Sequence, residues 1–225
     1  MNKLFLLPHA GGSSTLFRRW ERSINCEVIK LDYPGHWIRS KENLIKNFDL
    51  LVEDMTQIIM LKSNPTDRLY IFGHSLGAIL SRHIAHKLVK EGYCIERLFI
   101  SSSESPNCFP EESIKNIIND EDLLGLIGID VASKNEESYM GIISILKNDL
   151  ELCKSYNYNT CPYQSIKSTI MWGNTDWMLQ EKNIKKWDSF LNVTDFICLK
   201  GDHFYLTEAK NIEIISDYIN SILSK

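Results

Sequence analysis

The stretch LYIFGHSLG, at residues 69–77, decides the fold because it places a serine between two glycines directly after an apolar run. The run Leu69–Phe72 predicts a strand, and Ala78–Lys90 carries apolar residues at helical spacing. A chain turns this sharply from a strand into a helix only where glycines remove clashing Cβ atoms. The turn lifts the Ser75 hydroxyl above the sheet edge, toward the positive end of the helix dipole. Ser75 is therefore the candidate nucleophile.

Short apolar runs of this kind recur along the chain and alternate with helical patterns. The runs lack polar alternation, which is typical of strands covered on both faces of a parallel sheet. Amphipathic segments lie between them. Clear examples are Phe48–Leu61 and the final predicted helix, which carries Ile215 on its apolar face. This alternation predicts a doubly wound α/β fold with a mostly parallel sheet, in one domain over residues 1–225. The other predicted strands are Leu4–Leu7, Val28–Leu31, Leu98–Ser101, Thr169–Trp172 and Phe196–Leu199.

The composition excludes several classes of protein. The 225 residues are 44% hydrophobic and 24% charged, unlike disordered or collagen-like chains. The net charge of −4 argues against a dedicated nucleic-acid binder, which carries a basic excess. No apolar stretch reaches the roughly 18 residues of a membrane span, and the apolar run at the N-terminus is too short for a signal peptide. Six scattered cysteines without a CxxC pair predict reduced thiols, a cytoplasmic location, and neither metal nor cofactor.

One region, from Glu104 to Glu151, interrupts the alternation of strands and helices. It holds 11 acidic residues and 3 lysines, a net charge of −8. Three apolar clusters, around Ile117, Leu124 and Ile143, predict two or three short helices. We expect a helical lid inserted at about residues 104–160. An extra helical layer without a gating role is the alternative.

A serine hydroxyl is a weak nucleophile and needs a base, and His203 is the best placed of the histidines. It lies in GDHF, at residues 201–204, after the last predicted strand and before the final helix. A carboxylate has to hold this base in one tautomer. Asp176 follows the strand Thr169–Trp172 and gives the chain order serine, acid, histidine. Glu104, at the end of the preceding predicted strand, stays open as the alternative acid.

An oxyanion hole needs two backbone N–H donors that converge on one point. The amide of Leu76, the residue after the nucleophile, is the first candidate. The second comes from the loop after an early strand, and PHAGG at residues 8–12 follows the first strand here. We assign the second donor to the amide of Ala10. The alternative is that the two glycines of this loop only form a turn.

Four motifs taken together resemble the type II thioesterases. These are the stand-alone α/β-hydrolase enzymes that accompany non-ribosomal peptide and polyketide synthases. The motifs occur in the order and spacing of that family, and the resemblance runs from about residue 4 to about residue 206. They are LPHAGG at residues 7–12, DYPG at 32–35, GHSLGA at 73–78 and GDHFYL at 201–206.

Three positions depart from the family pattern, and none of them is a position of the predicted triad. His36 follows YPG where an arginine is usual. The lid string that usually reads LRAD reads LKND at residues 146–149. Asp202 precedes the histidine where a glycine is usual. The departures therefore bear on carrier contacts and on the shape of the acyl pocket.

The resemblance implies a substrate, namely an acyl thioester on the phosphopantetheine arm of an acyl or peptidyl carrier protein. It also implies an editing role, in which misloaded or stalled carriers are cleared, or the release of an intermediate. Leu123 and Ile143 of the lid are then candidates for contact with the acyl chain. The acidic lid would repel an acidic carrier, so Arg18, Arg19 and Arg22 are the candidate docking residues, unless they are ordinary solvated charges.

We expect a monomer that works without a cofactor and binds neither nucleic acid nor membrane. Two other functions stay open. A small-ester carboxylesterase or lipase would share every catalytic residue. A catalytically silent binding protein with the same fold is the non-enzyme alternative.

Overall fold

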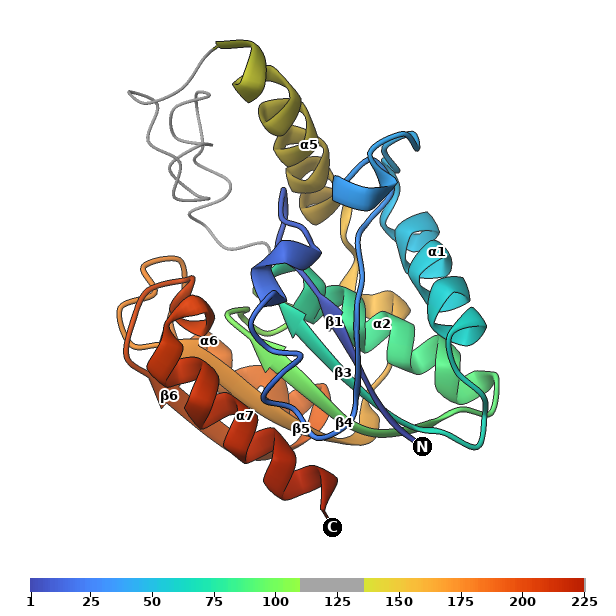
Figure 1. Cartoon of the computed structure of the whole chain (residues 1–225), viewed down its shortest axis with the longest axis vertical. Helices are drawn as coiled ribbons and strands as arrows, with labels where there is room; N and C mark the ends of the chain where they lie inside the picture. The colour runs from blue at the N-terminus through green and yellow to red at the C-terminus, as the bar shows by residue number, and fades with distance from the viewer. Residues whose placement is uncertain (110–135, 225) are drawn as a thin grey trace.

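A computed structural model describes residues 1–109 and 136–224 (Figure 1). Its sheet has six strands in the order β2-β1-β3-β4-β5-β6, and every neighbouring pair is parallel. This confirms the predicted α/β fold. The strands are β1 (Asn2–Leu7), β2 (Glu27–Lys30), β3 (Arg68–His74), β4 (Cys94–Ser101), β5 (Gln164–Gly173) and β6 (Leu191–Leu199).

Helices cover both faces of this sheet. The helices α1 and α2 pack on one face, while α7 and the short 3₁₀ helix η1 pack on the other (Figure 1). Only this double layer buries a parallel sheet completely. The α-helices are α1 (Phe48–Leu61), α2 (Leu76–Lys90), α5 (Glu136–Ser155), α6 (Glu181–Ile184) and α7 (Ala209–Leu223). The 3₁₀ helices are η1 (Ser14–Phe17), η2 (Trp37–Arg39), η4 (Tyr158–Thr160), η5 (Lys185–Ser189) and η6 (Tyr205–Thr207).

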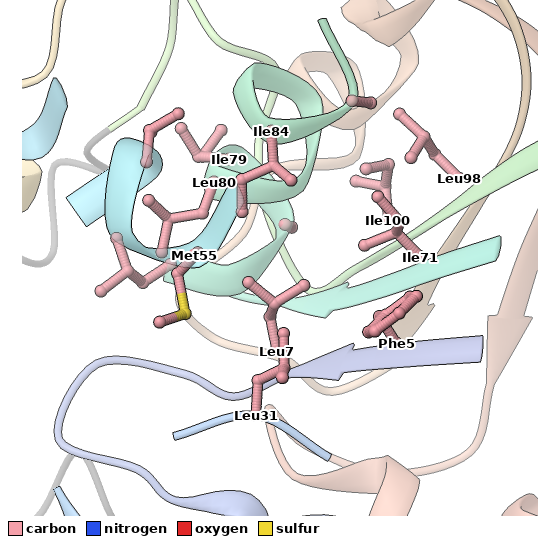
Figure 2. Close-up of a cluster of buried hydrophobic side chains, with 14 of the residues drawn as sticks. Phe5, Leu7, Leu31, Met55, Ile71, Ile79, Leu80, Ile84, Leu98 and Ile100 are labelled. Atoms are coloured by element: carbon pink, nitrogen blue, oxygen red, sulfur yellow. The ribbon is translucent and has the colours of Figure 1, made fainter. Parts of the chain in front are cut away.

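The strand β1, between β2 and β3, shows how the two cores form. Phe5 and Leu7 point into the core beneath α1 and α2, which Figure 2 shows, together with Met55. Leu4 and Leu6 point into the core beneath α7. Successive side chains of a strand point to opposite faces, so an unbroken apolar run serves two cores.

The lid prediction is only partly within the described residues. The apolar cluster around Ile143 belongs to one helix, α5, that runs for 20 residues and is longer than the short helices expected. The clusters around Ile117 and Leu124 lie outside the described residues. Among residues 1–109 and 136–224, none of the helices has the length and hydrophobicity to cross a bilayer. All six cysteines are free thiols.

Candidate active site

The turn between β3 and α2 holds Ser75 in a conformation that few side chains adopt, with φ 54° and ψ −115°. Its amide donates to the Ser101 carbonyl oxygen at 2.8 Å. A Cβ atom on Gly73 would lie 2.1 Å from the Gly77 carbonyl oxygen, and one on Gly77 would lie 2.4 Å from the carbonyl oxygen of Leu7. Both glycines are therefore required for the turn, as the sequence predicts, and the turn presses directly against the end of β1.

His203 and Asp176 face each other at the carboxyl ends of β6 and β5. His203 Nδ1 lies 2.9 Å from Asp176 Oδ2, and both side chains are buried. The second carboxylate oxygen of Asp176 accepts from the Met178 amide at 3.1 Å. The carboxylate is thus fixed from two sides, and it fixes the imidazole in turn. The adjacent Asp202 caps its own turn, since it accepts from the Phe204 amide at 2.8 Å.

Glu104, the alternative acid, lies at the end of β4 and has other partners. Its carboxylate accepts from the Gln180 amide at 2.8 Å and from the Asn183 side chain at 3.1 Å. These residues belong to the segment that follows Asp176. Glu104 therefore supports the loop that bears Asp176, while Asp176 is the carboxylate that contacts the His203 ring.

Two further histidines pack around His203. The His74 ring lies 4.9 Å from the His203 ring and 5.9 Å from the His9 ring, centroid to centroid. Burial, with a smaller effect from His203, lowers the pKa of His9 to about 3 and lowers the pKa of His74 well below its ordinary value. Both rings are therefore neutral at physiological pH. The elbow that carries Ser75 and the loop that carries His203 are in this way packed together.

No hydrogen bond joins Ser75 to His203 within the described residues. Hydrogen bonds between catalytic groups are often long without a substrate and shorten when one binds. The missing hydrogen bond therefore does not argue against proton transfer from Ser75 to His203. Phe204 completes the surroundings of the base, with its ring 5.4 Å from that of His203 and 4.9 Å from that of His9.

The loop at residues 8–14 passes over the elbow and contains Ala10. The Pro8 carbonyl oxygen accepts from the Gly77 amide at 3.1 Å and from the Tyr33 hydroxyl at 2.7 Å. In the described part of the chain, the amides of Ala10 and Leu76 donate no hydrogen bond. Neither predicted oxyanion donor is therefore occupied by an acceptor from the described residues.

Three side chains of the DYPGH stretch, at residues 32–36, hold this loop. Tyr33 contacts Pro8, as described above. The Asp32 carboxylate accepts from the Ser14 amide at 2.6 Å and from the Ser14 hydroxyl at 2.9 Å. His36 contacts Asp149 of α5, and that carboxylate accepts from the Gly11 amide at 2.7 Å. The helix α5 is therefore hydrogen-bonded directly to the candidate oxyanion loop.

Of the two candidate lid residues, only Ile143 lies within the described residues. Ile143 is buried on α5, one turn before Leu146 on the same face. The Leu146 side chain lies against Gly11, where an added Cβ atom would be 2.9 Å from Leu146 Cδ1. This face of α5 thus covers the candidate oxyanion loop. Leu123 lies outside the described residues. In the described ranges, no group of three His, Cys, Asp or Glu side chains could hold a metal ion.

The family model of the thioesterase domain matches residues 2–223, which is nearly the whole chain. The protein belongs to the thioesterase family. It is 28% identical over 220 residues to the probable anguibactin biosynthesis thioesterase AngT of Vibrio anguillarum, covering 90% of this chain and 85% of AngT. The protein is thus an enzyme of the hydrolase class.

Two solved thioesterases have the same fold. RedJ, from the prodiginine pathway of Streptomyces coelicolor, superposes with a TM-score of 0.86 at 22% identity, covering 98% of this chain and 86% of RedJ. YbtT, a type II thioesterase from the yersiniabactin pathway, superposes with a TM-score of 0.81 at 23% identity, covering 99% of this chain and 92% of YbtT. The predicted resemblance to the type II thioesterases of non-ribosomal peptide and polyketide pathways is confirmed.

Proposed function

We propose that this thioesterase hydrolyses acyl groups from the phosphopantetheine arm of acyl or peptidyl carrier proteins. The observation that carries the proposal is the 2.9 Å contact between His203 and Asp176 beside a strained serine elbow, in a chain of the thioesterase family. Its role is the editing of misloaded or stalled carriers, with release of an intermediate as the second possibility. The monomeric state and the cytoplasmic location stay predictions from the sequence.

The proposed reaction is an acyl transfer in two halves. His203 takes the proton of the Ser75 hydroxyl, whose oxygen attacks the thioester carbonyl carbon. The amides of Leu76 and Ala10 stabilise the negative oxygen, and Asp176 stabilises the imidazolium. The C–S bond then breaks, and the thiolate takes the proton from His203. In the second half, His203 activates a water molecule that releases the free acid and restores Ser75.

The side of the site at which the carrier arm leaves follows from this mechanism. The leaving sulfur has to face His203, because that ring supplies its proton. A cavity of about 510 Å³ lies on this side and is lined by His9, Phe204, Arg18 and Arg19. A guanidinium pairs well with a phosphate, and the arm carries a phosphodiester at its far end. We assign the arm to this cavity; the third docking candidate, Arg22, is exposed but does not line it.

The proposed function is tested with Ser75→Ala and two families of substrate. The wild type should hydrolyse an acyl-carrier thioester and react with a fluorophosphonate probe, and the variant should do neither, with a loss on the order of 10⁶ in kcat. Failure of the probe to label the wild type would favour the silent binding protein. A kcat/KM for p-nitrophenyl esters above that for carrier-bound thioesters would favour the carboxylesterase.

The docking assignment is tested separately. Arg18→Glu and Arg19→Glu should raise the KM for an acyl-carrier thioester by about tenfold or more, because reversed charge repels the phosphate. Hydrolysis of a short thioester of N-acetylcysteamine, which has no phosphate, should stay unchanged. Arg22→Glu serves as the control of equal charge. Equal effects of all three substitutions on KM would indicate a general effect of surface charge and overturn the assignment.

A further inference from the structure

We propose that His36 and Asp149 are positioning residues, which hold the Ala10 amide at the oxyanion through a buried charge pair that alkaline pH breaks. The inference rests on the proposed function, because it assumes that Ala10 donates to the oxyanion. Neither residue touches the reacting atoms. Both act through the backbone of the loop at residues 8–14.

The first step is that Ala10 lies between two fixed points of the chain. On one side, the Pro8 carbonyl oxygen accepts from the Gly77 amide at 3.1 Å, which ties the loop to the nucleophile elbow. On the other side, the Gly11 amide donates to Asp149 Oδ2 at 2.7 Å. An amide in a loop has a defined direction only if its neighbours are held. The hydrogen bond to Asp149 fixes the side of Ala10 that is not tied to the elbow.

The second step concerns the protons of His36. Its Nδ1 atom lies 3.0 Å from the Pro34 carbonyl oxygen, which can only accept, so Nδ1 carries a proton. Its Nε2 atom lies 3.0 Å from Asp149 Oδ2, the oxygen that also accepts from Gly11. A second proton has to lie between Nε2 and Oδ2 for this contact to be favourable. Because Oδ2 already accepts from the Gly11 amide, we place this proton on Nε2, which makes the pair an imidazolium and a carboxylate.

The third step is the burial of this pair and its surroundings. The two side chains are 3% and 1% exposed, so water cannot replace either partner. The groups that face His36 are Asp149 from α5, Asp32 and Tyr33 from its own loop, and His9 from the loop after β1. Tyr33 and His9 are neutral, because burial raises the pKa of the tyrosine and lowers that of the histidine. The nearby charges are thus carboxylates, which favour a charged His36.

The charge of the pair depends on pH in a direction that can be worked out. Burial by itself lowers the pKa of His36, but the hydrogen bond and charge of Asp149 outweigh it and raise the pKa above its ordinary value. The pair is therefore fully formed below the ordinary pKa, and it is lost as the pH rises through the raised one. The unprotonated Nε2 atom of His36 then turns a lone pair toward Asp149 Oδ2, and the repulsion displaces this carboxylate from the Gly11 amide.

The experiment measures kcat and KM for an N-acetylcysteamine thioester from about pH 6 to about pH 10, after subtraction of the uncatalysed rate. The loss of one oxyanion donor costs about 10² to 10³ in kcat, so displacement of one donor should cost about tenfold. We expect the wild-type kcat to fall by about tenfold on the alkaline side, with a KM that changes by less than about twofold.

Two variants at position 36 separate positioning from general stability. His36→Arg keeps a permanent charge and should hold its kcat through the alkaline range. His36→Gln has no charge at any pH, and its kcat at neutral pH should equal the wild-type value at alkaline pH. His86→Gln is the matched control, since His86 lies on α2 away from the loop and should leave the pH profile as it is.

An alkaline limb in His36→Arg that matches the wild type, or an unchanged kcat in His36→Gln, would overturn the inference. Circular dichroism and the extent of fluorophosphonate labelling check that each variant is folded with a reactive Ser75. If the wild type itself neither labels nor hydrolyses the thioester, the proposed function has failed instead. The two failures are thereby distinguished.

Discussion

Gly173 lies so close to Asp202 that a Cβ atom on the glycine would come within 2.2 Å of the Asp202 carbonyl oxygen. The loops after β5 and β6 are also hydrogen-bonded. The Thr175 amide donates to the Gly201 carbonyl oxygen at 2.9 Å, and the Gly201 amide donates to the Asn174 side chain at 2.9 Å. One loop carries the candidate acid and the other the candidate base. Their contact is therefore set by the backbone as well as by the two side chains.

Gly173→Ala should separate these two loops, because the atoms that a methyl group would meet belong to the backbone and cannot rotate away. We expect a loss of stability of about 1–3 kcal/mol, and a kcat reduced by at least about tenfold. Thermal melting and thioester hydrolysis measure the two effects. Gly141→Ala on α5 is the control, since nothing lies within 4 Å of its added Cβ atom. Equal kcat in both variants would mean that the close approach is not needed for catalysis.

The strands could be predicted in their centres but not at their starts. The helix α1 has the predicted bounds, Phe48–Leu61, because its apolar period and the capping Asn47 agree. By contrast, β6 begins at Leu191, five residues before the predicted start at Phe196. It is an edge strand whose exposed residues before Phe196, namely Asn192 and Thr194, are polar. An unbroken apolar run therefore starts only at Phe196, and the earlier residues of this strand, which mix apolar and polar types, are missed by a search for such runs.

The candidate site could be predicted where it depends on chain order. Ser75, Asp176 and His203 each follow a strand of a parallel sheet, and the carboxyl ends of such strands lie at one edge. The same rule could not choose between Asp176 and Glu104, because β4 and β5 are neighbours in the sheet. Sequence reasoning missed the packing of His9 and the bond between α5 and the loop at residues 8–14. The one signal was that His36 and Asp149 lie at or next to departures from the family pattern.

Ile143→Phe should change which acyl chains are accepted, if the buried face of α5 borders the acyl site. Ile143 lies one turn from Leu146, which contacts Gly11 of the candidate oxyanion loop. A larger side chain should lower kcat/KM for long acyl thioesters by about tenfold, a change of about 1.4 kcal/mol, and affect short ones less. Ser144→Phe, at the exposed neighbour, is the control. Uniform loss across chain lengths together with a lower melting temperature would show that Ile143 is structural core.

Met55→Ala should destabilise the protein without a specific effect on catalysis. Met55 is fully buried between α1 and the sheet, in the cluster of Figure 2. Truncation of such a side chain leaves a cavity and costs about 2–5 kcal/mol. Leu50→Ala on the same helix removes a side chain that is 62% exposed and should cost less than about 0.5 kcal/mol. Urea denaturation followed by circular dichroism measures both, and similar midpoints would contradict the assigned core.

The choice between the two acids gives the largest expected difference. Asp176→Asn keeps the shape of the side chain but removes the charge that stabilises the imidazolium, and it favours the wrong tautomer of His203. The precedent for this change in triad hydrolases is a loss of about 10⁴ in kcat. Glu104→Gln keeps an oxygen that can accept from the Gln180 amide, and it leaves the contact between Asp176 and His203 in place. It should stay within about tenfold of the wild type, or about 1.4 kcal/mol.

Both acid variants are measured by kcat/KM on one acyl thioester, with circular dichroism as the check on folding. The two carboxylates can be compared directly by substitution with an amide. Each is buried, and each accepts a hydrogen bond from a backbone amide. A general cost of removing a buried negative charge would therefore appear in both variants alike. Only an acid that orients the base loses activity far beyond that shared cost. The reverse ranking would move the acid to Glu104 and leave Asp176 as a residue that shapes the loop after β5.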